Sequence, residues 1–159
     1  MTAWNDNATF PAMDTLEIAL RLFAATAAGA AFGLNRDMHD KETGVRTLGL
    51  VGLGAALAVM AAARIGNEGD VSRAIQGIVT GIGFLGAGVI VRPATGLRVH
   101  GLTTAACTWL TACVGAACAV AEWRAVAIGV VLAFVVLIFG GPFEKWMRKR
   151  LQSPDDGTG

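Results

Sequence analysis

The residues that could do chemistry gather in two short polar segments. One segment reads GLNRDMHDKETGVRT at positions 33–47, and the other reads VRPATGLRVHGLTTAA at positions 91–106. Their guanidinium groups can bind anions, their carboxylates can bind cations, and their hydroxyls can donate or accept hydrogen bonds. If both segments lie on the same side of the protein, they predict one functional cluster: Asn35, Arg36, Asp37, Arg46, Thr47, Arg98, His100, Thr103 and Thr104.

A second interpretation of the same segments involves no function. Pro93 and Gly96 favour turns, and Thr103 or Thr104 is the type of residue that caps the start of a helix. The basic residues would then be the positively charged flanks that accompany membrane spans on the cytoplasmic side. Both interpretations remain open from the sequence.

The sequence contains no arrangement typical of an enzyme or of a metal site. No nucleophile has a base beside it, and no phosphate-binding loop is present. The cysteines Cys107, Cys113 and Cys118 have no histidine or acidic residue between them, so a zinc site is not expected. We therefore predict a non-enzymatic protein with no catalytic residue, no metal and no cofactor.

The composition places the chain in a membrane. Of its 159 residues, 54% are hydrophobic and 16% are charged, and the formal net charge is +1. A soluble domain has about a quarter of its residues charged, and a nucleic-acid-binding protein usually carries a strong basic excess. The apolar majority also excludes a disordered chain. These numbers predict one small integral membrane domain that binds no nucleic acid.

The chain contains five apolar runs that approach the 20 or so residues a membrane-spanning helix needs. They are approximately 15–34, 47–63, 74–91, 102–121 and 124–141. We predict an all-α bundle of about five transmembrane helices over 15–141, an amino-terminal segment at 1–14 and a tail at 142–159. The run 74–91 is rich in glycine, so a broken third segment, or four complete spans, is the alternative.

The distribution of basic residues predicts the orientation of the bundle. With the amino terminus outside, the cytoplasmic segments hold nine lysines and arginines and the outer segments hold three. Cytoplasmic loops carry the excess of these residues in membrane proteins. We therefore expect the amino terminus outside the cell and the carboxyl-terminal tail in the cytoplasm.

Small residues mark the faces through which the predicted helices would pack. Glycine recurs through 74–91, and 102–121 carries an arc of threonine, cysteine and glycine. These two runs should therefore form the centre of the bundle, and the arc is either a packing seam or the wall of a hydrated path. Because small side chains let membrane helices approach closely, we expect helix packing at Gly77, Gly81, Gly83, Gly86, Gly88 and Gly115.

Arg21 is the basic residue that lies inside an apolar run. A charge within the membrane is costly and often functional. Glu17 precedes it by four residues, which places the two side chains on the same helical face with the acid first. The sequence predicts an intramembrane charge pair, and a structural and a functional role for Arg21 are both open.

Several motifs resemble the MgtC/SapB family of bacterial inner-membrane proteins. The resemblance extends from Arg21 to about Gly115 and includes a glycine-rich stretch and a threonine motif in the expected order. The matching residues are RLxxA at Arg21, G-x-x-R-D at Gly33, G-x-R-T at Gly44, GIGFLGAG from Gly81, and GLTTAA from Gly101 with Trp109 shortly after.

This resemblance implies a multi-pass protein of the bacterial inner membrane that is linked to adaptation to low magnesium and, in pathogens, to virulence. It also implies partners: the F-type ATP synthase or small hydrophobic peptides. Two departures matter. Asn35 stands where the family usually has glutamate, which leaves Asp37 as the nearby acid, and the chain is expected to be a short form without the soluble ACT-like domain of longer members.

Two functions follow from these observations. The first is a regulator that binds other membrane proteins through its glycine faces, surrounded by membrane lipid and assembled as a homo-oligomer. The alternative is a small oligomeric ion channel or transporter, which the polar arc of 102–121 and the glycine-rich run 74–91 favour.

Overall fold

The structure is a computed structural model that describes residues 13–39, 41, 43–66, 68–90 and 101–151. Within these residues the chain is all-helical, which confirms the predicted fold class. The five helices are α1 (Thr15–Asp37), α2 (Val45–Ile65), α3 (Glu68–Val89), α4 (Leu102–Ala119) and α5 (Trp123–Leu151).

Four of these helices, α1, α2, α4 and α5, are long and apolar enough to cross a membrane. The chain is therefore a multi-pass membrane protein. Helix α3 is continuous from Glu68 to Val89, so the glycine-rich segment is unbroken over these residues. It is not one of the four candidate spans, and its first turns carry Glu68, Asp70 and Arg73. The orientation of the bundle stays a prediction.

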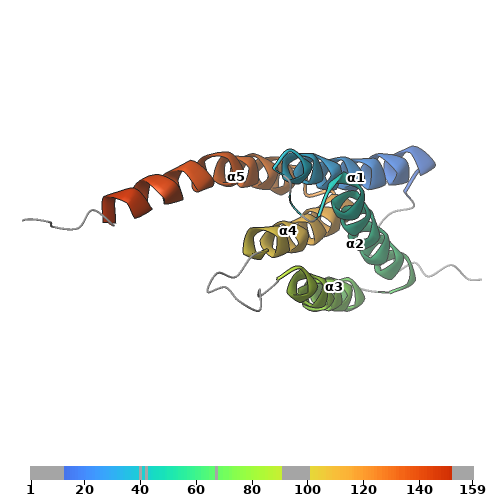
Figure 1. Cartoon of the computed structure of the whole chain (residues 1–159). Coiled ribbons are helices and arrows are strands. Elements are labelled where there is room, and N and C mark those ends of the chain that lie inside the picture. Colours follow the sequence, from blue (N-terminus) through green and yellow to red (C-terminus); the bar gives the residue numbers. More distant parts are fainter. Residues whose placement is uncertain (1–12, 40, 42, 67, 91–100, 152–159) are drawn as a thin grey trace, which may run out of the picture.

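Helix α4 lies at the centre of the bundle and contacts each of the other four helices. In Figure 1 it runs between α1 and α3, with α2 crossing beside it. Buried residues of α1, α2 and α4 build the main core, among them Phe32, Leu48, Val59 and Cys118. The expectation that the run 102–121 is central is thus confirmed. The run 74–91 was expected to share the centre, but α3 lies at the edge and α2 packs in the centre instead.

Glycines allow α1, α2 and α4 to cross with their backbones in contact. A Cβ on Gly115 would collide with the backbone carbonyl of Gly52, and a Cβ on Gly52 would collide with that of Ala25. A Cβ on Gly29 would likewise collide with the backbone carbonyl of Leu48. Of these, only Gly115 belongs to the predicted packing set.

Of the five α3 glycines that were expected to pack, only Gly86 lies against another helix. A Cβ on Gly86 would lie 3.5 Å from the Cβ of Ala105, an ordinary packing contact. A Cβ on any of the other predicted packing glycines would have no atom within 4 Å: Gly77, Gly81, Gly83 and Gly88. The rotation of α3 about its own axis explains this difference, because it places Ile82 and Gly86 toward α2 and α4. Any packing by the four exposed glycines requires another molecule.

Helix α5 extends away from the bundle and is largely exposed (Figure 1). Phe134 packs against Phe32 of α1, with 5.3 Å between ring centroids. The helix continues past the predicted span end at 141 and through Pro142 as far as Leu151, so the predicted tail begins as helix.

Candidate functional site

The structure brings most of the predicted functional cluster to one end of the bundle. Asn35, Arg36 and Asp37 form the last turn of α1, while Arg46 and Thr47 lie in the first turn of α2 and Thr103 and Thr104 in the first turn of α4. Arg98 and His100 lie outside the described residues. Two hydrogen bonds tie these three helix ends together.

The first of these bonds joins α1 to α4. Arg36 is buried, with 6% of its surface exposed, and its Nη2 donates to Thr104 Oγ1 over 2.6 Å. Its Nε is buried without a hydrogen-bond partner, and among the described residues no carboxylate lies within ion-pair distance. The charge is nevertheless well placed relative to α1, because a cation in the last turn of a helix faces the negative end of its dipole.

The second bond joins α1 to α2. Asp37 Oδ2 accepts a hydrogen bond from the Val45 backbone N–H over 3.0 Å, so this carboxylate caps α2. A Cβ on the intervening Gly44 would collide with the Asp37 carboxylate, so a larger residue there would displace the side chain that caps α2. Asp37 therefore has a structural role whether or not it has another.

The predicted capping role of Thr103 or Thr104 is wrong. The N-cap of α4 is Gly101, which has φ 90° and provides no side-chain cap. Thr104 is instead buried and accepts from Arg36, and Thr103 is exposed. A Cβ on Gly101 would also collide with the Val89 carbonyl, so the end of α3 sits directly against the start of α4.

The remaining members of the cluster lie nearer the surface. Asn35 is half-buried, and its backbone carbonyl accepts a hydrogen bond from His39 Nδ1 over 2.7 Å. Arg46 and Thr47 are exposed. Sequence reasoning missed Thr43, which is buried and whose hydroxyl has no hydrogen-bond partner among the residues that the structure describes, and no pattern around it signals this burial.

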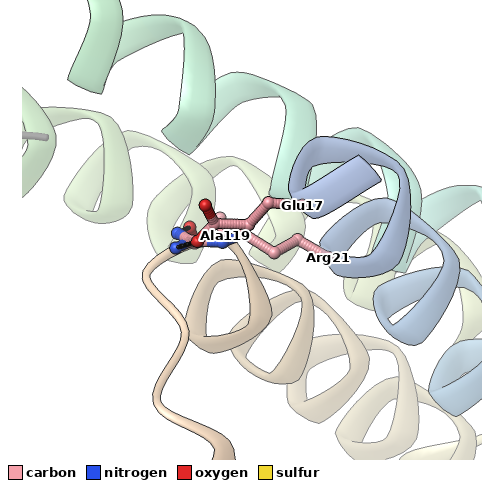
Figure 2. A network of polar contacts seen from close by, with 3 residues as sticks. All are labelled: Glu17, Arg21 and Ala119. Carbon is pink, nitrogen blue, oxygen red and sulfur yellow. Dashed lines mark hydrogen bonds and ion pairs between the residues drawn. The ribbon is translucent and has the colours of Figure 1, made fainter. Parts of the chain in front are cut away.

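The opposite end of α4 holds the predicted charge pair (Figure 2). Arg21 Nη2 pairs with the carboxylate of Glu17 on the same helix. Arg21 Nη1 also donates to the Ala119 carbonyl over 2.6 Å, and the arginine is only 6% exposed. Ala119 is the last residue of α4, where carbonyls lack partners within the helix and the dipole is negative. Sequence reasoning found the ion pair but not this contact.

The polar arc of α4 is satisfied by its own backbone. Thr108 Oγ1 donates to the Thr104 carbonyl over 2.9 Å, and Thr111 Oγ1 donates to the Cys107 carbonyl over 2.7 Å. Both threonines are buried. These observations favour a packing seam over a hydrated path within one chain. Across the described part of the chain, no three histidine, cysteine or acidic residues approach closely enough to hold a metal ion.

Comparison with known proteins gives one family. The family model described as MgtC family matches residues 22–146. The chain is 40% identical to protein SrpB of Synechococcus elongatus, covering 87% of this chain and 81% of the relative. It is 36% identical to an uncharacterized protein of Synechocystis sp., covering 79% of this chain and 53% of the relative.

A third relative is protein MgtC of Salmonella typhimurium, which is 40% identical over 66% of this chain and 44% of its own length. The chain thus spans about half the length of the Synechocystis relative and less than half of the Salmonella one. No solved structure matches it. The matched residues cover the five helices almost completely, and the chain belongs to the MgtC family.

Proposed function

We propose that this protein is a non-enzymatic regulator in the bacterial inner membrane that acts by binding other membrane proteins and contributes to growth when magnesium is scarce. Its membership of the MgtC family and the role implied by the resemblance of its motifs support this proposal. The partners we propose are a second copy of the chain and, by the same resemblance, the F-type ATP synthase or small hydrophobic peptides.

The observation that carries the proposal is the exposed face of α3, where glycines lie beside the exposed side chain of Phe84. Gly77 and Gly88 lie on this face, and a side chain on either would meet no atom within 4 Å. Within a membrane, helices associate largely through close packing of such small residues, since lipid provides no hydrophobic drive. A face of this kind turned away from its own chain is suited to a helix of another molecule.

A growth experiment tests both parts of the proposal. A deletion strain at limiting magnesium should grow poorly and should recover with the wild-type gene but not with Gly77→Leu or Gly88→Leu. The matched control is Gly141→Leu on α5, where a side chain also meets no atom within 4 Å. Membrane levels of all variants should be equal, because a Cβ at each of these positions meets no protein atom within 4 Å. Normal growth of the deletion strain would overturn the link to magnesium.

Co-purification and flux measurements complete the test. Chemical cross-linking in native membranes should capture a stoichiometric protein partner, either a second copy or another membrane protein, and the Gly88→Leu variant should lose it. Purified protein in proteoliposomes should carry no ion flux. An ion-selective flux that disappears with Thr104→Val would overturn the regulator and establish the channel or transporter instead.

A further inference from the structure

A groove with a volume of about 660 Å³ lies between α2 and α3. Its walls are apolar, with Leu50 and Val51 on α2 and Ile78 and Leu85 on α3, and Ala112 of α4 also lines it. Two glycines widen the groove, Gly54 on α2 and Gly81 on α3, and a Cβ on either would have no atom within 4 Å.

The length of the groove fits one lipid chain. Its lining residues on α2 run from Arg46 to Ala55, which is about 13 Å along a helix axis. The hydrocarbon core of a bilayer is about 30 Å thick, so this length is close to that of one leaflet. An acyl chain that enters from one leaflet would fill the groove from end to end.

One end of the groove is polar and carries the guanidinium group of Arg46. Arg46 and Thr47 line this end, and both are exposed in the first turn of α2. The N–H groups of a helix's first turn have no partner within the helix, and they lie at the positive end of its dipole. The Asp37 carboxylate already occupies the Val45 N–H, so a bound headgroup would be held by Arg46 and Thr47 beyond it.

We infer that this groove binds one acyl chain of an anionic phospholipid, with the lipid phosphate held by Arg46 and Thr47. The apolar walls account for the chain, and the guanidinium at the open end accounts for the preference for a negative headgroup. The groove borders the exposed face of α3 that the proposed function uses, because Gly81 lines the groove and lies on the same helical stripe as Gly77 and Gly88, which do not line it. Gly54, on α2, belongs to the groove and not to that face, so Gly54→Leu tests the groove alone.

Native mass spectrometry of the full chain, released from nanodiscs, tests the inference. Nanodiscs of phosphatidylcholine alone are compared with nanodiscs that also contain phosphatidylglycerol. The wild-type protein should retain one phosphatidylglycerol in preference to phosphatidylcholine. Gly54→Leu and Gly81→Leu should lose it, because the leucine side chains would project into the groove from positions where an added Cβ meets no protein atom within 4 Å. Gly83→Leu is the matched control, since Gly83 is equally open but lies outside the groove.

A charge substitution tests the headgroup contact independently. Arg46→Gln should lower the preference for phosphatidylglycerol about fivefold, the effect of losing one arginine near an anionic headgroup. Arg64→Gln, at the other end of α2, should leave the preference unchanged. Equal retention of both lipids by the wild type, or an equal loss in Gly83→Leu, would overturn the inference. If the leucine variants instead convert a dimer to a monomer with unchanged lipid retention, the groove is an interface between copies.

Discussion

Arg21 and Arg36 of α1 hold the two ends of α4. Arg21 Nη1 donates to the Ala119 carbonyl at the carboxyl end of α4, and Arg36 Nη2 donates to Thr104 Oγ1 at its amino end, each over 2.6 Å. Fifteen residues separate the two arginines, and fifteen separate their two partners, which is about 22 Å along each helix. The two contacts therefore fix the antiparallel register of α1 against α4.

The first prediction concerns Arg21. Arg21→Ala should lower the free energy of unfolding by about 1.5–3 kcal/mol, because the Ala119 carbonyl loses a charged hydrogen-bond donor in a buried place. Glu17→Gln should cost less than about 1 kcal/mol, because the Glu17 side chain is 47% exposed. Thermal or denaturant unfolding in detergent measures both. Equal losses in the two variants would show that the ion pair, rather than the contact with α4, provides the stability.

The second prediction concerns the pair Arg36 and Thr104. Thr104→Val should cost about 1–3 kcal/mol, since it leaves a buried guanidinium nitrogen without an acceptor. Arg36→Met removes both the hydrogen-bond donor and the positive charge of the side chain. The double variant should be less destabilised than the sum of the two single variants, because each substitution removes the same bond. Unfolding measurements on all four proteins give the coupling energy, and strict additivity would contradict the contact.

The third prediction separates two kinds of glycine. Gly115→Ala should destabilise the protein, because its Cβ would collide with the Gly52 carbonyl and force α2 and α4 apart. Gly83→Ala should leave stability unchanged or raise it by up to about 1 kcal/mol, because alanine favours a helix and the position is open. Melting temperatures of the two variants in the same detergent check this. A loss of stability in Gly83→Ala would mean that α3 packs more closely than described.

The fourth prediction tests whether Asp37 does more than cap α2. Asp37→Ala should cost about 1 kcal/mol of stability, the usual value of a lost helix cap, while Asp37→Asn should keep most of it because an amide oxygen still accepts the Val45 N–H. Unfolding experiments measure these costs, and the growth assay at limiting magnesium measures function. Growth retained by Asp37→Asn assigns the residue a capping role, whereas growth lost with stability intact assigns the carboxylate a functional one.

The sequence predicted the features that depend on single segments. Long apolar runs predicted the helices, and the four-residue spacing predicted the Glu17–Arg21 pair, because both are local properties of one helix. Contacts between helices were not predictable in this way. The bond from Arg36 to Thr104 connects residues 68 positions apart, and nothing in either segment identifies its partner.

The orientation of α3 was likewise not predictable from its own sequence. Its sequence has a glycine side and an isoleucine side, and either could face a membrane-embedded bundle, since lipid and protein interior are both apolar. The structure turns Ile82 inward and leaves Gly77 exposed. The packing roles of Gly29 and Gly52 were not predictable for a related reason, because Gly29 stands among alanines and Gly52 among leucines and other glycines, where no single residue stands out.

The two hydrogen bonds from α1 to α4 also constrain the order in which contacts between helices form during synthesis. The partners of Arg21 and Arg36 on α4 lie 98 and 68 residues later in the chain. Until the ribosome has made residue 119, Arg21 has Glu17 alone as its partner, and a cation with incomplete pairing is costly inside a bilayer. Arg21 and Arg36 therefore gain these two hydrogen-bond acceptors only after α4 has been synthesised, although α2 can pack against α1 before that.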